Sequence, residues 1–218
     1  MASEEQICIR VWSDYVCPFC YLEEPILDRL QQAYPEQVKI EWRAFELRPD
    51  PVPTLEPNGE YLRTAWQHSV YPMAENRGMT LRLPPVQPRS RKALEAAEFA
   101  RTKKRFATMH HALFEGFFAE GLDIGDLNVL LNIGTQVGLN REELRIALET
   151  NQFTPQVLED ETLAHQLGIT GVPTMLIGFC DQPLERAVRV SGAQSEELLQ
   201  AAVERVRSGE ISRVSARF

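Results

Sequence analysis

Long apolar runs, a basic excess and abundant cysteine are all missing from this sequence. No uninterrupted apolar stretch approaches the length needed to cross a bilayer, and the opening Met-Ala-Ser-Glu-Glu-Gln lacks the apolar core of a secretory signal. We therefore expect a cytoplasmic protein that does not act at a membrane. The net charge of −8 argues against a protein that grips nucleic acid by bulk electrostatics.

Cysteine is scarce, with four residues in a chain of 218. In a reducing compartment such a small set is not expected to form a structural disulfide framework. Catalysis, metal binding or simple burial must then account for the cysteines. The length suits one large domain, or one domain that carries a sizeable insertion.

The N-terminal part of the chain predicts a βαβ unit. The apolar run from Ile7 to Trp12 indicates a buried strand. A helical pattern follows, with apolar residues at spacings of three and four and a kink expected at Pro25. Period-two alternation from Val38 to Phe45 predicts a half-buried strand. The usual right-handed crossover would make the two strands parallel.

From Gly59 to Gly168 the patterns are helical, after a proline-rich loop over residues 47–57. Asn140, with Glu143 three residues on, and Thr154, followed by Pro155, have the character of helix caps. Amphipathic stretches lie near residues 90–118, 126–137, 141–150 and 155–167. We interpret this region as a helical subdomain inserted into a larger fold.

The last fifty or so residues return to strand patterns. Two apolar runs, Thr174 to Phe179 and Arg186 to Val190, flank a turn at residues 181–183, and a closing helix is expected from Ser195 to Val206. The order β-α-β, helical insert, β-β-α predicts an α/β fold with one mixed sheet. Its domain would comprise residues 1–58 and 169–218, and the helical subdomain residues 59–168.

The most informative motif is Cys17-Pro18-Phe19-Cys20, at the junction of the first strand and the first helix. Free backbone N–H groups and the helix dipole favour an anion at such an end. The Cys17 thiolate is therefore expected to be a competent nucleophile near neutral pH. Cys20 lies one turn later and can resolve a mixed disulfide, and Pro18 suits the first turn of a helix.

The cysteines allow three other interpretations. A zinc site would need more ligands, and the adjacent His110 and His111 cannot face one ion from a helix. No metal is therefore expected, and two inert buried thiols do not suit this context. Cys8 and Cys180 fit small buried hydrophobic residues best, although a Cys8–Cys180 redox pair remains open because distant strands can be neighbours in a sheet.

A second motif, Gly171-Val172-Pro173-Thr174, directly precedes the third predicted strand. Proline is tolerated at a strand start, and taken alone the Val172–Pro173 bond would be expected to be trans. A cis bond here would instead present the Val172 backbone to an extended substrate next to Cys17. Pro18, Phe19, Val172 and Pro173 are therefore the candidate substrate-binding residues.

Four stretches together resemble the DsbA family, and specifically its FrnE-like branch. They are Ser13 to Tyr21, Trp42 to Pro49, Gly171 to Thr174 and Val190 to Gln194. The resemblance implies a thioredoxin fold with a helical insertion, Cys17 as nucleophile, Cys20 as its partner and Pro173 as a cis-proline. One departure is clear: thioredoxins place a buried acid where this chain has Val11. Glu46 is then a candidate for proton transfer to Cys20.

The expected function is thiol–disulfide exchange on protein or small-thiol disulfides. No cofactor is expected, beyond glutathione as a redox partner, and the direction of electron flow and the oligomeric state are open. The alternative is a glutathione-dependent transferase or isomerase, of the kappa class or the 2-hydroxychromene-2-carboxylate isomerase type. Such enzymes typically lack the second cysteine, so Cys20 favours the first function. A redox-inert binding module is the third hypothesis.

Overall fold

A four-stranded mixed sheet lies at the centre of the computed structural model, which describes residues 6–209. The strand order is β2-β1-β3-β4, where β1 pairs with β2 in parallel and with β3 antiparallel, and β3 pairs with β4 antiparallel. The mixed α/β sheet predicted from the sequence is confirmed. The strands are β1 (Ile7–Ser13), β2 (Val38–Ala44), β3 (Thr174–Phe179) and β4 (Val188–Ser191).

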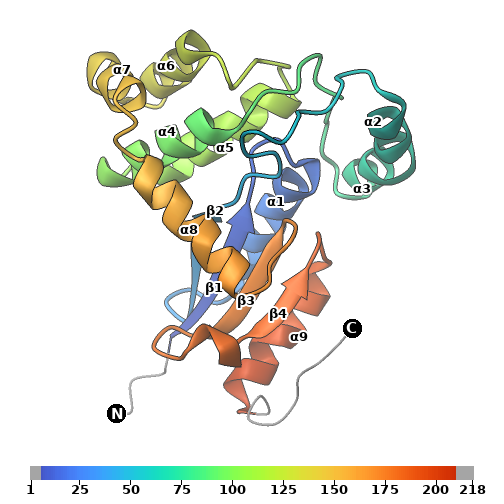
Figure 1. Cartoon of the computed structure of the whole chain (residues 1–218). Coiled ribbons are helices and arrows are strands. Elements are labelled where there is room, and N and C mark those ends of the chain that lie inside the picture. The colour runs from blue at the N-terminus through green and yellow to red at the C-terminus, as the bar shows by residue number, and fades with distance from the viewer. Residues whose placement is uncertain (1–5, 210–218) are drawn as a thin grey trace.

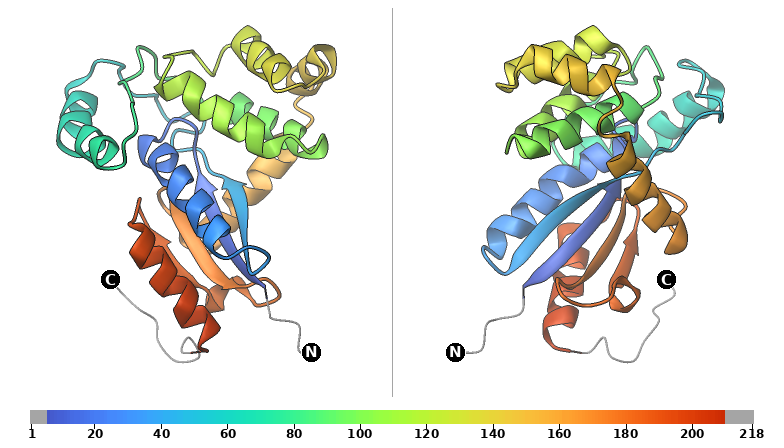
Figure 2. Two further views of the ribbon diagram at one scale, coloured as in Figure 1. Left: turned by 180° about the vertical axis from the view of Figure 1, so that it is seen from behind. Right: turned by 60° about the vertical axis from the view of Figure 1, so that its left-hand side comes forward.

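The two faces of the sheet bury different side chains because successive residues of a strand point to opposite sides. Ile7, Ile9 and Val11 of β1 share a core with α1 (Pro18–Ala33) and α9 (Glu196–Arg207). Trp12 and Leu176 share a second core with Ala164 of α8 (Thr154–Gln166), so α8 crosses the other face (Figure 1). The sheet is therefore covered by helices on both sides (Figure 2).

The remaining helices gather beyond the end of the sheet at which β1 passes into α1 (Figures 1 and 2). Their aromatic core includes Phe114 and Phe117, and it also takes in Cys17, Cys20 and Tyr21. The cysteine motif is thus at the contact between the sheet domain and these helices. The helices are α2 (Glu60–Ala65), a π-helical turn (Trp66–Val70), α3 (Tyr71–Asn76), α4 (Arg91–Thr102), α5 (Phe106–Phe118), α6 (Leu127–Gln136) and α7 (Arg141–Glu149).

Several predicted details are corrected. The stretch 90–118 is two helices, because the chain turns between them and Lys104 takes a φ of 58°. Arg186 lies in a 3₁₀ turn (Leu184–Arg186), and the fourth strand starts two residues later than predicted. Thr154 does not cap α8, since its hydroxyl donates to Glu95 at 2.5 Å. Asn140 does cap α7, accepting from two backbone N–H groups.

The domain boundaries remain a prediction, and their outer ends at residues 1–5 and 210–218 lie outside the described residues. Helix α8, which the sequence assigns to the insert, packs on the sheet: the Trp12 indole donates to the Asp160 carbonyl at 3.0 Å. Arg43 of β2 donates to the Asp160 carboxylate at 2.8 Å. In residues 6–209 no helix is long and apolar enough to cross a membrane.

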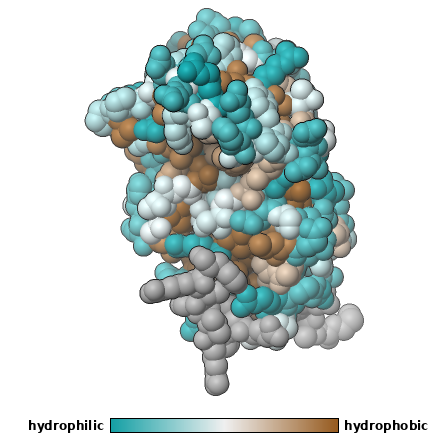
Figure 3. All heavy atoms as spheres, turned by 90° about the vertical axis from the view of Figure 1, so that its right-hand side faces the viewer, coloured by the Kyte–Doolittle hydropathy of each residue, from teal (hydrophilic) through white to brown (hydrophobic). Residues whose placement is uncertain are grey.

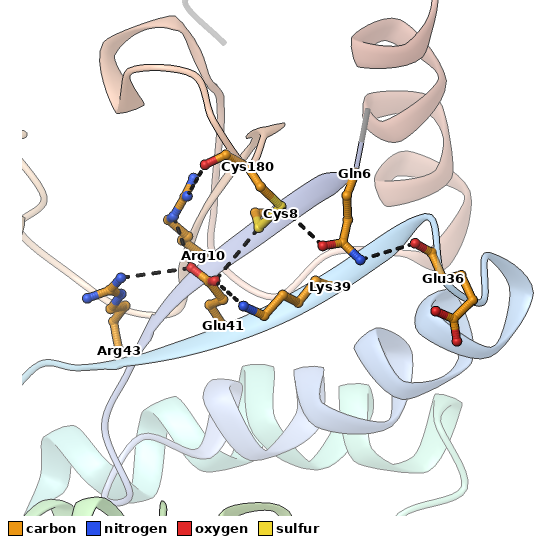
Figure 4. Close-up of a disulfide and its surroundings, with 8 residues drawn as sticks. All are labelled: Gln6, Cys8, Arg10, Glu36, Lys39, Glu41, Arg43 and Cys180. Atoms are coloured by element: carbon orange, nitrogen blue, oxygen red, sulfur yellow. Dashed lines mark hydrogen bonds and ion pairs between the residues drawn. A yellow bond between two sulfur atoms is a disulfide. The ribbon is translucent and has the colours of Figure 1, made fainter. Parts of the chain in front are cut away.

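Cys8 and Cys180 form a disulfide, which corrects the expectation of two separate buried side chains. The cause is the strand register: Cys8 of β1 lies opposite Gly178 of β3, and Cys180 follows two residues later on the same face. The bridge lies among charged side chains at the start of β1 (Figure 4). Arg10 donates to the Cys180 carbonyl at 3.0 Å and pairs with Glu41 at 3.1 Å.

Candidate active site

Cys17 occupies the N-cap position of α1, with extended backbone angles (φ −94°, ψ 112°) and Pro18 at the first helical position. A tight turn after β1 brings the chain there, since the Cys17 N–H donates to the Asp14 carbonyl at 3.0 Å. The Cys20 N–H in turn donates to the Cys17 carbonyl at 3.1 Å. The predicted strand–helix junction is therefore present, and Cys17 meets the positive end of the helix dipole.

The two thiols of the motif are free and differ in access. Cys17 is 4% exposed and Cys20 is 0% exposed, so Cys17 faces a groove rather than open solvent. Burial raises the pKa of the Cys20 thiol well above its ordinary value, the adjacent Cys17 adds to the rise, and the Ser13 side chain counters part of it. Cys20 is therefore a protonated thiol when the site is reduced.

The Val172–Pro173 loop lies beside Cys17, although the two segments are 155 residues apart in sequence. The Cys17 thiol donates to the Val172 carbonyl at 3.5 Å. The Val172–Pro173 peptide bond is cis. Backbone bonds fix the loop, because the Gly192 N–H donates to the Pro173 carbonyl at 2.8 Å. Both sequence motifs thus meet at one place.

A groove of about 310 Å³ opens next to the Cys17 thiol. Four of the predicted site residues line it, namely Cys17, Pro18, Phe19 and Val172. Pro173 instead lines a neighbouring cleft of about 370 Å³ with Arg189 and Ser191, and Cys20 lies behind the groove wall. Seen from the side of α3 and α9, apolar residues gather between the helical upper part and the sheet below (Figure 3).

The opposite wall of the groove comes from the helical insert and was not foreseen from the sequence. Leu62, Trp66 and Val70 line it from α2 and the π-helical turn. All three are at least 92% buried, and they repeat at a spacing of four. That periodicity was a detectable signal of a helix face. Its position facing Cys17 depends on long-range packing.

Where thioredoxins place a buried acid, this chain has Val11, which is fully buried. Glu46, the candidate from the sequence, is paired with Arg91 and lies close to Glu161. Burial raises the pKa of Glu46 to about 7, against the opposing effect of Arg91. The Ser13 side chain lowers the pKa of Cys20, although its Oγ has no hydrogen-bond partner among the described residues.

Asp14 is a buried acid that the sequence analysis did not single out. Its carboxylate accepts from the Leu47 N–H at 2.7 Å and from the Val16 N–H at 3.3 Å. Burial raises the pKa of Asp14 to about 6, although these hydrogen bonds oppose the rise. Asp14 therefore ties the turn before Cys17 to the chain that leaves β2.

Among the described residues, no group of three or more His, Cys, Asp or Glu side chains could hold a metal ion. His111 and Glu24 are one pair of such side chains in contact, at 3.2 Å. Burial raises the pKa of Glu24. The hydrogen bond to Glu24 raises the pKa of His111. The pair joins the buried Glu24 of α1 to the exposed His111 of α5, and neither residue lines the groove.

Residues 8–204 match the DSBA-like thioredoxin domain. The chain belongs to the DSBA-like thioredoxin domain family. This family consists of thiol–disulfide oxidoreductases. The chain is also 36% identical, over 78% of its length and 86% of the relative, to the uncharacterized protein YwbO of Bacillus subtilis (strain 168).

Three solved structures share the fold of this DSBA-like protein. A probable DsbA oxidoreductase, SCO1869 of Streptomyces coelicolor, matches with a TM-score of 0.76 and 24% identity, covering 98% of this chain and 94% of its own. A 2-hydroxychromene-2-carboxylate isomerase matches with a TM-score of 0.74 and 20% identity, covering 94% of this chain and 100% of its own. Cytosolic disulfide reductase DsbM from Pseudomonas aeruginosa, with GSH, matches with a TM-score of 0.66 and 17% identity, covering 93% of this chain and 96% of its own. The thioredoxin fold with helical insertion is thereby confirmed.

Proposed function

We propose that this protein exchanges thiols and disulfides on protein or small-thiol substrates, with Cys17 as the nucleophile and Cys20 as the resolving thiol. The observation that carries the proposal is the position of Cys17. It occupies the N-cap position of α1, lines a groove and has its sulfur 3.5 Å from the Val172 carbonyl oxygen, with a second thiol directly behind it. Helix N-termini favour the thiolate, which is the reactive form.

In the reducing direction the Cys17 thiolate attacks one sulfur of a substrate disulfide. A mixed disulfide forms between Cys17 and the substrate, and the other substrate sulfur leaves as a thiolate. Cys20 then loses its proton and attacks the Cys17 sulfur. The Cys17–Cys20 disulfide forms, the second substrate sulfur is released, and the substrate has gained two electrons. The oxidising direction is the same sequence in reverse.

The substrate is proposed to lie along the groove in an extended conformation. Apolar walls from Phe19, Leu62 and Trp66 suit an apolar side chain on either flank of the substrate cysteine. The Val172 backbone, next to Cys17, supplies the main-chain edge that an extended peptide can pair with. Pro18 and Phe19 complete the floor at the helix end.

The test is reduction of insulin by dithiothreitol, followed by turbidity, together with refolding of a reduced, unfolded ribonuclease. The Cys17→Ser variant should lose the catalysed rate in both assays. The control is Cys8→Ser with Cys180→Ser, assayed at a temperature at which circular dichroism shows it folded. It removes the other two sulfurs and should keep that rate. Full activity in Cys17→Ser would refute the proposal.

A glutathione-dependent transfer or isomerisation is the second candidate, favoured by the fold shared with the 2-hydroxychromene-2-carboxylate isomerase. The polar cleft lined by Pro173 and Arg189 has room for a small charged thiol. The discriminating variant is Cys20→Ala. This candidate would be favoured if Cys20→Ala kept its turnover of glutathione and the wild type showed no exchange of protein disulfides. A Cys17 thiol that iodoacetamide alkylates only slowly would instead support a redox-inert module.

The FrnE-like branch, the isomerase activity and the cytoplasmic location are parts of the same proposal. DsbM, which shares the fold, is described as cytosolic. Disulfides are rare in that compartment, so the Cys8–Cys180 bridge offers a direct check. Rapid alkylation of intact cells, followed by mass spectrometry, should find the bridge reduced in a cytoplasmic protein. A fully oxidised bridge would contradict the cytoplasmic location.

A further inference from the structure

The opposite wall of the groove belongs to a small lobe of the helical insert. This α2–α3 lobe, residues 60–77, comprises α2, the π-helical turn, α3 and the residue that follows α3. It stands to one side of α4 to α7 (Figures 1 and 2). Its residues Leu62, Trp66 and Val70 line the groove together with Cys17. The position of the lobe therefore sets the width of the groove beside Cys17.

One side chain ties the lobe to the helices and loops of the sheet domain. Arg77, which follows α3, donates to the Leu22 carbonyl and, at 3.0 Å, to the Glu23 carboxylate, both in α1. It also donates, at 2.6 Å, to the Gln194 carbonyl in the loop before α9. Within residues 6–209, the other hydrogen bonds of the lobe are internal or reach only the loops at its two ends. The rest of its attachment is apolar, because its buried face joins the aromatic core.

The acid that receives Arg77 is buried and has few partners. The Glu23 side chain is 0% exposed and that of Arg77 is 12% exposed. The Glu23 Oε2 accepts from Arg77 and, at 3.0 Å, from the Gln194 N–H, whereas the Glu23 Oε1 has no hydrogen-bond partner among the described residues. A buried carboxylate is costly without its cation, so the pair opposes any movement that separates Arg77 from α1. A pair that adds little net stability but fixes geometry suits a positioning role.

The same contacts connect the lobe with the other two parts of the site. Helix α1, which Arg77 binds, begins directly after Cys17. Gln194 lies two residues after Gly192, whose N–H donates to the Pro173 carbonyl at 2.8 Å. The lobe wall, the helix that follows Cys17 and the cis-proline loop are thus joined through one guanidinium.

We propose that Arg77 is a positioning residue, which holds the α2–α3 lobe at the distance from Cys17 that lets the groove enclose a large apolar side chain beside the substrate cysteine. This inference rests on the proposed function and deepens it, because it makes a polypeptide with an apolar residue next to its cysteine the favoured substrate. The composition of the groove agrees with such a substrate, since Arg48 is the one charged residue in its lining.

Small disulfides and peptide disulfides should depend on the lobe differently. A small disulfide needs only the Cys17 sulfur at the helix N-terminus, whereas a peptide with a large apolar side chain also uses the lobe wall. Burying one apolar side chain improves binding about tenfold or more. Loosening the lobe should therefore raise the KM for such a peptide and leave its kcat, and the reaction of a small disulfide, unchanged.

The test compares three disulfides with dithiothreitol as the reductant: 2-hydroxyethyl disulfide, and two peptides that differ only in having Phe or Ser before a cysteine joined to 2-mercaptoethanol. Arg77→Met should raise the KM of the Phe peptide at least about fivefold, while its kcat and the rates with the other two disulfides stay within about twofold. Because Arg77→Met leaves Glu23 buried without its cation, Arg77→Met with Glu23→Gln is the second variant, and it should give the same result. The matched control is Arg63→Met, which removes an arginine of the same lobe that reaches only the Asn58 carbonyl, at 2.6 Å. It should leave all three reactions unchanged.

Hydrogen–deuterium exchange gives a readout that does not depend on the chemistry. Exchange over residues 60–77 should be faster in both Arg77 variants than in the wild type and in Arg63→Met, with exchange in α4 to α7 unchanged. Unaltered exchange of the lobe, or an unaltered KM for the Phe peptide, would overturn the inference. So would an equal loss with all three disulfides, or a wild type that does not prefer the Phe peptide. If the wild type reacts with none of the three disulfides, the proposed function itself fails.

Discussion

The two ends of strand β1 carry cysteines with opposite properties. At its start Cys8 is joined to Cys180, and beyond its end Cys17 and Cys20 are free thiols. Cys8 faces a strand partner among charged side chains, whereas Cys17 caps a helix and faces an apolar groove. The difference lies in the surroundings of each cysteine. Strand pairing brings Cys8 and Cys180 together as a crosslink, whereas the helix N-terminus favours the thiolate of the nucleophile proposed for Cys17.

The largest effect is expected from removing the bridge at the start of β1. The bridge closes a loop with a sequence separation of 172 residues. Loop-closure entropy then predicts a loss of about 5 kcal/mol of unfolding free energy for Cys8→Ser with Cys180→Ser. Urea denaturation should measure it in a Cys17→Ser, Cys20→Ser background, which keeps the active-site pair silent. An unchanged midpoint would contradict a stabilising role.

The next effect concerns the other end of β1, where Asp14 is buried. Its pKa is about 6 in the folded protein against 3.8 for the free side chain. The folded state therefore binds more protons between these values, and unfolding free energy falls as pH rises from about 4 to about 6. Asp14→Asn should remove a fall of about 3 kcal/mol over that range. Urea denaturation at several pH values measures the difference.

Glu46 contributes to the same pH range, because its pKa is raised from 4.5 to about 7. Its contribution is present in both proteins and largely cancels in the comparison, because Glu46 has the smallest of the effects that act on the pKa of Asp14. If the unfolding free energies of the wild type and of Asp14→Asn changed in parallel with pH, Asp14 would not be the titrating group. Stability that rises from about pH 4 to pH 6 only in the wild type would contradict the sign.

The smallest effect tests the charged surroundings of the bridge. Arg10→Met removes a hydrogen bond to the Cys180 carbonyl and an ion pair with Glu41. Because the Arg10 side chain is only 12% exposed, we expect a loss of about 1 kcal/mol. Lys39→Met is the matched control: Lys39 pairs with the same Glu41 but is 53% exposed, so its loss should be smaller. Equal losses in thermal denaturation would contradict this argument.

The arrangement of the cysteines could be predicted from the sequence beyond the end of β1 but not at its start. The spacing of Cys17 and Cys20, and the apolar run before them, are local signals that fix a strand–helix junction. The meeting of Cys8 and Cys180 depends on the register between two strands far apart in the chain. A local pattern has no information on that register, and the sequence analysis therefore favoured separate burial.

The site divides in the same way. Cys17 and Val172 belong to recognisable motifs, and the sequence predicts both as site residues. Ser13, Tyr15 and His110 carry no such motif, because they come together only through packing of α5 against the end of β1. The break between α4 and α5 was missed because Lys103 to Arg105 are good helix formers, and the left-handed turn at Lys104 opposes their propensity.

The Cys8–Cys180 bridge makes the chain a covalent ring with a short N-terminal tail and a longer C-terminal one. The sheet's first three strands, the whole helical insert and both active-site cysteines belong to the ring, whereas β4 and α9 belong to the C-terminal tail. A protease that cuts once at the loop between α3 and α4 would therefore leave one species on a non-reducing gel. The two fragments would separate only after reduction, so limited proteolysis can report the oxidation state of the bridge.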